Sequence, residues 1–340
     1  MTDKPNDPSG KHPLRNWLCI TAAAVLVAVT VTGIYAGRLM NRIHYVDSEV
    51  TPSLSQQELN RMQQSETVPH TAAVKPSVRK HTIFQPVVKE DNVVNILLIG
   101  QDRRAGGNRA RSDTMILCTF NTSKQTLTMT SFLRDIWVQI PGYEDNKLNA
   151  AYVAGGMKLL DKTLEHNFGI HIDGNIEVDF EQFVQIVDML GGVEIELRSD
   201  EARYINRSLH TKDLTEGKHT LNGRQALCYC RIRSLDRDAD FSRTDRQRTL
   251  IDALIAKYRS IGLTKALSMM NDILPMITTD MTKQQLVSYG YQLLPMISSV
   301  KIVSQRIPAE GTFTTPVIRN MSVLLADMDA ARKLLKETLE

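Results

Sequence analysis

Residues 92–100 read NVVNILLIG, an almost wholly apolar run that decides the class of fold this sequence predicts. A strand that is apolar on both faces is typical of an α/β sheet, in which helices cover each side. Working outward from this run, we expect further strands at residues 115–120, 127–131, 176–180 and 193–197. Helical periodicity predicts a helix that ends near residue 168 and further helices at 183–190, 242–258, 263–276, 282–294 and 321–339. Another strand is expected at 300–305. Because strands and helices alternate, the sequence predicts an α/β fold, an α/β/α sandwich with a central mixed sheet.

Charged residues stand where these predicted strands begin or end. Asp102 follows the first strand, Asp113 precedes the second, and Arg134 and Asp135 end the third. Strand ends are where α/β sheets usually build their sites. Two aspartates on adjoining loops, with arginines close by, indicate a set of oxygen ligands for Mg²⁺. In the alternative interpretation, Asp102 and Asp113 only form ion pairs with neighbouring arginines such as Arg111.

A second cluster of charge lies in residues 226–258, ALCYCRIRSLDRDADFSRTDRQRTLIDALIAKY. Residues 226–232 alternate as a strand does, which would place Arg231 and Arg233 side by side on one face. A helix is expected next, because residues 242–245 form a capping-box pattern. This stretch therefore predicts a strand, a loop rich in Asp and Arg, and a helix.

The first turns of that helix aim two polar side chains inward. At about 100° per residue, Arg243 and Gln247 share the stripe of apolar residues that continues to residue 258. A helix N-terminus attracts anions, and the planar fork of arginine suits phosphate oxygens. Together with Arg231 and Arg233, these residues predict a pocket for a phosphate or pyrophosphate. The alternative is a surface network in which the aspartates of this stretch neutralise the arginines.

The N-terminal part of the chain carries the pattern of a membrane anchor. Residues 1–16 are polar, and residues 17–36 hold no charge over a length that spans a bilayer as a helix. A cleaved signal peptide is the alternative, although its small-residue cleavage site would fall within the apolar run. The expected division is a cytoplasmic tail at 1–16, one transmembrane helix at 17–36, an extracytoplasmic linker at 37–90, and a folded domain at 91–340, with a motif core at 91–260 and C-terminal helices at 261–340.

Composition narrows the function classes. The formal net charge of +3 is too small to indicate a nucleic-acid partner, and the arginines are balanced by aspartates. Dispersed histidines and the absence of C-x-x-C and G-x-S-x-G patterns argue against zinc and against a Ser-His-Asp triad. In an exported domain the plausible disulfide joins Cys118 to Cys228 or Cys230, which leaves at least one free thiol.

Taken together, these motifs resemble the LytR-CpsA-Psr family of membrane-anchored cell-wall enzymes. The segments that carry the resemblance, in the family's order, are NILLIGQDRR, ARSDTMIL, SFLRDIWVQIPG, KLNAAYVAGG, DMLGGVEIEL and LNGRQALCYCRIRSLDRDADFSRTDRQR. Several independent motifs in one order are far more specific than any one alone. Two positions depart from the family's usual pattern: Leu133 replaces a Pro, and Ala239 replaces a Gly.

The resemblance implies a function and a set of site residues. Such enzymes move a glycopolymer from an undecaprenyl-pyrophosphate carrier to peptidoglycan, forming a phosphodiester and releasing undecaprenyl phosphate. Their catalytic domain lies outside the membrane of a Gram-positive-type envelope. By resemblance, the metal ligands are Asp102 and Asp113, with Mg²⁺ as the expected ion and Mn²⁺ as a possible one. The implied pyrophosphate ligands are Arg134, Arg231, Arg233, Arg243 and Gln247, with Arg111, Lys147 and Arg246 as weaker candidates. The implied catalytic residues are Asp240, Arg134 and Asp135.

Two other functions stay open at this point. A non-catalytic, membrane-anchored scaffold or regulator would bind the same polyanionic lipid or glycan without turning it over. A hydrolase would cleave the lipid pyrophosphate with water instead of a sugar hydroxyl. The presence of the carboxylates favours an enzyme over a scaffold.

Overall fold

The computed structural model describes residues 37–46, 54–64, 89–101, 112–233, 235, 239–260, 268–269, 271–293 and 299–339. The predicted tail at 1–16 and the predicted transmembrane helix at 17–36 lie outside these residues. Within the described ranges, every helix is too short or too polar to cross a membrane.

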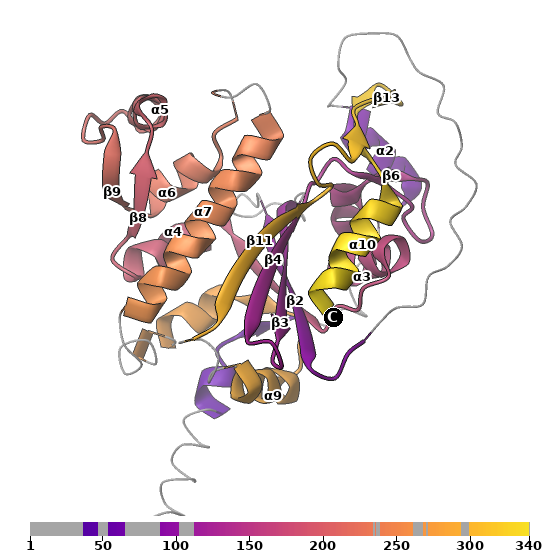
Figure 1. Ribbon diagram of the computed structural model, residues 1–340, viewed down its shortest axis with the longest axis horizontal. Coiled ribbons are helices and arrows are strands. Elements are labelled where there is room, and N and C mark those ends of the chain that lie inside the picture. The colour runs from indigo at the N-terminus through magenta and orange to yellow at the C-terminus, as the bar shows by residue number, and fades with distance from the viewer. Residues whose placement is uncertain are drawn as a thin grey trace, which may run out of the picture.

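A seven-stranded sheet forms the centre of the molecule (Figure 1). Its strands, in spatial order, are β1 (His44–Tyr45), β10 (Thr278–Thr279), β7 (Gly174–Asp179), β2 (Val93–Gln101), β3 (Ser112–Asn121), β4 (Thr126–Phe132) and β11 (Lys301–Ile307). β3 is antiparallel to both of its neighbours, whereas β2 is parallel to β7 and β4 is parallel to β11. The predicted central mixed sheet is therefore confirmed, and β2 has the central position that its apolar sequence predicts.

Helices cover both faces of this sheet, as Figure 1 shows. On one face lie α3 (Leu148–Phe168) and α10 (Met328–Leu339), and on the other lie α7 (Ala239–Ser260) and α9 (Lys283–Leu293). Successive side chains of a strand point to opposite faces, so Leu97 packs towards α3 while Ile96 packs towards α7 and α9. We call the apolar layer beside α3 and α10 the closed layer, and the one beside α7 and α9 the open layer.

A further unit packs on the outer side of α7. It consists of α4 (Phe180–Met189), the hairpin of β8 (Val193–Leu197) and β9 (Gly217–Leu221), α5 (Ser199–Leu209) and α6 (Gly223–Cys230). Residues 197–221, which are more polar, form α5 and β9 of this unit. Short strands complete the described fold: β5 (Trp137–Val138), β6 (Asn146–Lys147), β12 (Phe313–Thr314), β13 (Val317–Ile318), β14 (Met321–Ser322) and β15 (Leu325–Ala326).

The predicted strand at residues 226–232 is wrong, because α6 occupies this stretch. The Asn222 side chain accepts from the backbone N–H of Gln225, and the Gln225 side chain accepts from the backbone N–H of Asn222, which caps the helix start. The buried residues Ala226, Tyr229 and Cys230 follow helical spacing. The alternating pattern was coincidental, because helix capping and burial against α4 act on a period of 3.6 residues.

The predicted bounds of two segments, the helix at 321–339 and the linker at 37–90, are wrong. Residues 321–339 were expected to form one helix, but residues 321–326 contribute to two short strands and α10 begins only at Met328. In the predicted linker, α2 (Gln56–Gln64) packs on the fold, and Leu59 is 1% exposed within the closed layer. Tyr143 also donates to the carbonyl oxygen of Leu54 at 2.7 Å. Part of the region N-terminal to residue 91 therefore belongs to the folded structure.

Candidate functional site

A cavity of about 350 Å³ lies where several strands end at one edge of the sheet. The residues that line it are Thr114, Arg134, Phe180, Cys230, Arg231, Arg233, Arg243 and Gln247. Thr114 stands near the start of β3, Arg134 follows β4, and Phe180 follows β7 directly. Carboxyl ends of parallel strands commonly form such crevices in α/β folds.

The cavity gathers the five residues that the sequence predicted as its main anion ligands. Arg134, Arg231, Arg233, Arg243 and Gln247 come from the end of β4, the segment after α6 and the first turns of α7. The lining contains four arginines and no acidic side chain among the described residues. Such a cavity favours a ligand that carries several negative charges.

Arg231 stacks on an aromatic ring at the wall of the cavity. Its guanidinium carbon lies 4.7 Å from the centre of the Phe180 ring. The ring engages the flat face of the guanidinium, whereas phosphate oxygens bind its edge, so the two contacts are compatible. Phe180 sits at the start of α4, where Asp179 forms a capping box with Gln182. The rigid start of α4 therefore fixes the ring that orients Arg231.

Arg243 and Gln247 enter the cavity from α7. Arg243 is only 4% exposed, although its side chain is ionised at neutral pH. The helical phase predicted for these two residues is confirmed, because both point into the cavity while Leu250 is buried further along the helix. A guanidinium at this depth beside a helix N-terminus is costly unless it meets negative charge.

Arg134 and Lys147 share one carboxylate. Asp135 Oδ1 lies 2.7 Å from Lys147 Nζ, and Asp135 Oδ2 lies 3.3 Å from Arg134 Nε. All three side chains are largely buried. Asp135, predicted as a catalytic residue, therefore bridges a cavity arginine and the lysine that precedes α3. Lys147 itself is not among the residues that line the cavity.

Arg246, predicted as a weaker phosphate ligand, is not among the residues that line the cavity. Its Nε donates to Glu201 Oε1 at 2.8 Å, and both side chains are almost fully buried. Its Nη1 donates to the carbonyl oxygen of Ile232 at 3.4 Å. Arg246 thus ties α7 to α5 and to the segment that carries Arg231 and Arg233.

Of the two predicted metal ligands, the structure describes only the backbone of Asp113. Asp102 and Arg111 lie outside the described residues, and so do the side chains of Asp113 and Asp240. The backbone of Asp113 belongs to β3, at an irregularity where Gly100 pairs with Thr114 and Gln101 with Ser112. Asp113 thus stands across from the end of β2, and Asp102 is the next residue after that end.

Three residues before Phe180 on the chain, Glu177 forms the centre of a buried polar cluster that sequence reasoning missed. Glu177 on β7 accepts hydrogen bonds from the side chains of Gln101 on β2 and Tyr152 on α3. Glu177 is 7% exposed, Tyr152 2% and Gln101 1%. The cluster fixes the end of β2, the end of β7 and the first turns of α3. An acidic residue within an apolar strand was the signal that could have revealed it.

The cysteines of the described residues are thiols. Cys118, Cys228 and Cys230 are all free, so the disulfide that we considered is absent from this part of the chain. Burial raises the pKa of Cys230, which lines the cavity, to about 12. A thiol that stays protonated at neutral pH is a poor nucleophile. Cys230 therefore contributes to the wall and not to covalent chemistry.

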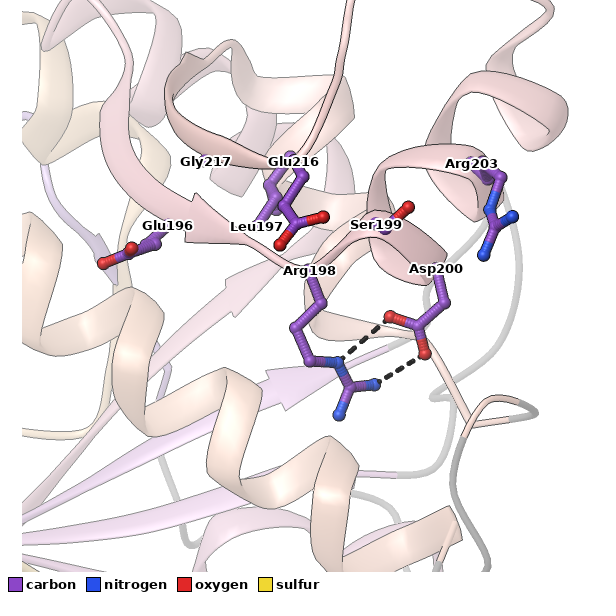
Figure 2. A pocket seen from close by; sticks show the side chains of 8 residues that line it. All are labelled: Glu196, Leu197, Arg198, Ser199, Asp200, Arg203, Glu216 and Gly217. Atoms are coloured by element: carbon purple, nitrogen blue, oxygen red, sulfur yellow. Dashed lines mark hydrogen bonds and ion pairs between the residues drawn. The ribbon is translucent and has the colours of Figure 1, made fainter.

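A second hollow, of about 690 Å³, lies on the outer unit between β8, β9 and the start of α5. Figure 2 shows acidic and basic side chains together around it. Arg198 donates from Nε and Nη2 to the two carboxylate oxygens of Asp200, each at 3.1 Å. Because its charges are mixed and this arginine is engaged, it suits a polyanion less well than the first cavity does.

Comparison with known proteins adds independent findings. The model of the LytR_cpsA_psr family matches residues 45–339. The regulatory protein MsrR of Staphylococcus aureus (strain Mu50) is 38% identical over 173 residues, which cover 50% of this chain and 51% of MsrR. The chain thus aligns with about half the length of that relative. The polyisoprenyl-teichoic acid–peptidoglycan teichoic acid transferase TagT of Bacillus subtilis is 28% identical over 309 residues, covering 89% of this chain and 88% of TagT.

Solved structures agree with this. A structure of TagT bound to LI-WTA superposes with a TM-score of 0.60 at 28% identity, covering 79% of this chain and 98% of the TagT chain. A structure of TagT with bound octaprenyl pyrophosphate lipid superposes with a TM-score of 0.57 at 27% identity, with 79% and 98% covered.

Proposed function

Since this chain belongs to the LytR-CpsA-Psr family, we propose that it is a phosphotransferase that moves a glycopolymer from an undecaprenyl-pyrophosphate carrier to peptidoglycan. A phosphodiester forms to the acceptor, and undecaprenyl phosphate leaves. The observation that carries the proposal is the convergence of Arg134, Arg231, Arg233, Arg243 and Gln247 on one cavity. TagT, named as a transferase of this kind and solved with a pyrophosphate lipid, supports it.

The arginines would bind the pyrophosphate and neutralise the charge that grows on the leaving phosphate. Phosphoryl transfer needs little covalent help from a protein and depends mainly on positioning and electrostatic stabilisation. Arg231, held against Phe180, and Arg243, buried at the start of α7, are fixed before the substrate arrives. Preorganised donors of this kind lower the barrier because they need no rearrangement during the reaction.

The lipid chain would occupy the open layer. This layer runs from β3 and α7, which line the cavity, to α9 at the other end of the sheet. Its partly exposed apolar side chains include Leu98, Ile255 and Tyr289. A long isoprenoid needs an apolar path beside its head group, and a layer with incomplete burial offers one.

A divalent ion, Mg²⁺ or alternatively Mn²⁺, forms part of the proposal. Asp102 and Asp113 would hold it, and bound there it would supply positive charge beside the transferring phosphate. The pairing of Gln101 with Ser112 supports this, because it brings the chain positions of the two aspartates to neighbouring strand ends. Asp240, in the first turn of α7, would serve as the acid or base for the attacking sugar hydroxyl.

The proposed location is the cell membrane, with residues 17–36 as a single anchor and the folded domain outside. The proposed partners are the lipid-linked glycopolymer, the peptidoglycan acceptor and the membrane itself. No nucleic acid is part of the proposal.

Mass spectrometry of the joined product tests the function. The full chain in detergent is incubated with a short undecaprenyl-pyrophosphate glycan, Mg²⁺ and a peptidoglycan oligomer. We expect joined product that is lost with EDTA and reduced at least about 100-fold by Arg231→Ala, by analogy with the removal of one charge-stabilising donor. Arg203→Ala, which removes an exposed arginine at the second hollow, is the matched control and should retain activity.

The same assay separates the alternatives. Free glycan phosphate without joined product would indicate a hydrolase. Tight binding of the lipid with neither product would indicate a scaffold and would refute the transferase.

A further inference from the structure

The outward face of α9 exposes large apolar side chains to water, which is unfavourable. Tyr291 is 85% exposed and Val287 is 53% exposed. Together with Lys283 they stand four residues apart, so they form one row along the helix. The opposite face packs on the open layer, where Leu293 is buried and Leu286 and Tyr289 are partly buried. Sequestering the exposed row from water would be favourable by the hydrophobic effect.

The segment that follows the predicted membrane anchor packs directly beside α9, as Figure 1 shows. Lys283 Nζ donates to Asn41 Oδ1 and lies 5.7 Å from the centre of the Tyr45 ring. β1 pairs with β10, which ends four residues before α9 begins. Because residue 36 ends the predicted anchor and residue 37 opens this segment, α9 is held close to the point where the chain would leave the bilayer.

Residues 37–46 and α9 carry exposed positive charge and no acidic residue. Arg38 and Arg42 are exposed on the segment, with Leu39 and Ile43 turned inward, and Lys283 is exposed on α9. Among the described residues, the exposed acids nearby include Asp272, next to Asn271, whose carbonyl oxygen accepts from Arg42 Nη1 at 3.1 Å. Glu90 and Asp91 are also exposed, next to Lys89, which pairs with Asp173 beside Tyr289. Basic residues beside an anchor attract anionic lipids, and tyrosine favours the interface between lipid and water.

We propose that the face of α9 formed by Lys283, Val287 and Tyr291 lies in the lipid–water interface of an anionic bilayer. This inference rests on the membrane anchor included in the proposed function, but not on the transferase chemistry. Tyr291 and Val287 would enter the head-group region, while Lys283, Arg38 and Arg42 would meet lipid phosphates. The contact orients the domain on the membrane.

This orientation has a consequence for the donor lipid. The α9 residue Tyr289 donates to Asp173, just before β7, whereas Phe180 at the cavity follows the other end of β7. Six residues of strand separate these ends by about 20 Å at 3.3 Å per residue. With α9 on the bilayer, the cavity stands above the membrane, and the open layer connects the two.

Fluorescence quenching by lipid tests the contact. The full chain is reconstituted in vesicles of phosphatidylcholine and phosphatidylglycerol that contain doxyl-labelled phosphatidylcholine. Tyr291→Trp adds a reporter on α9, and Arg207→Trp adds a matched one at an exposed position on α5, far from α9 in Figure 1. Trp17 and Trp137 are present in all variants. Subtracting the emission spectrum of the unsubstituted chain therefore gives the emission of the added tryptophan.

We expect the emission added by Tyr291→Trp to shift to shorter wavelength and to be largely quenched, and the emission added by Arg207→Trp to stay unquenched. Equal quenching of the two, or none for Tyr291→Trp, would overturn the proposal. Quenching that persists unchanged in pure phosphatidylcholine would overturn its anionic part. Trp17 lies within the predicted anchor, so its own quenching tests the anchor separately, and the transfer assay tests the chemistry.

Discussion

The two apolar layers of this protein differ in how completely they are buried. In the closed layer, the described residues comprise 27 buried hydrophobic side chains and six that are partly buried. In the open layer, the corresponding numbers are nine and eight. Both layers share the same strands, so the difference comes from the helices: α3 covers its face with buried residues such as Leu160 and Leu164, whereas Ile251 and Ile255 of α7 stay partly exposed. The closed layer is a core, and the open layer has the incomplete packing that a lipid chain could complete.

Truncation of one residue in each layer should show the difference in burial most clearly. Leu160→Ala, at a fully buried position, should lower the free energy of unfolding by about 3 to 5 kcal/mol. Ile255→Ala should lower it by only about 1 kcal/mol, because its side chain already contacts solvent. Urea denaturation measures both values.

The variant Ile255→Ala also tests whether the open layer binds the lipid chain of the donor. Ile255→Ala should raise the KM for an undecaprenyl donor but leave the KM for a donor with a short prenyl chain unchanged. Equal destabilisation by the two substitutions, or equal effects on the two donors, would contradict the assignment of the open layer to the lipid.

A smaller effect is expected where the closed layer meets the site. Tyr152→Phe removes the hydrogen bond that α3 donates to the buried Glu177 of β7. An intramolecular hydrogen bond contributes about 0.5 to 1.5 kcal/mol, so the free energy of unfolding should fall by about that amount. Thermal and urea denaturation measure this loss, and a stability equal to that of the unsubstituted chain would show that Glu177 does not depend on Tyr152.

The last prediction concerns how the free energy of unfolding depends on pH through Asp161, which lies on α3 beside the closed layer. Burial raises the pKa of Asp161 on α3 well above the usual carboxyl value, although Asn175 donates to it at 2.8 Å. A carboxyl group whose folded pKa is raised contributes stability that is present below its unfolded pKa and lost as pH rises through the folded pKa. Asp161→Asn keeps an acceptor for Asn175 and removes this titration.

The unsubstituted chain should therefore lose stability relative to Asp161→Asn as pH rises from about 4, near the ordinary carboxyl pKa. Urea denaturation from acidic to neutral pH follows the difference between the two chains. If the stability of the unsubstituted chain minus that of Asp161→Asn stays constant or increases with rising pH, Asp161 is ionised in the folded protein and the prediction is wrong.

Local sequence patterns predicted the structure correctly where burial of a segment follows from its own periodicity. The apolar run at β2 predicted a central strand because a strand buried on both faces carries few polar positions. The phase of α7 correctly placed Arg243 and Gln247 in the cavity, because that phase depends only on helix geometry. Residues 226–232 misled us, since seven residues with short apolar spacing suit a strand or a helix about equally. Capping by Asn222 and packing on α4 decided the outcome.

By itself, the sequence determined the class of fold, the positions of most main strands along the chain and the residue types that an anionic ligand requires. These follow from periodicity and from the chemistry of Arg, Asp and Gln, which are properties of short segments. Only the tertiary structure decided which of the weaker candidate ligands lie elsewhere. It drew Arg246 to Glu201 and left Arg243 in the cavity, although both lie on the first turns of one helix. It also decided that one face of the sheet is closed and the other open, because burial depends on which distant helices pack against a strand.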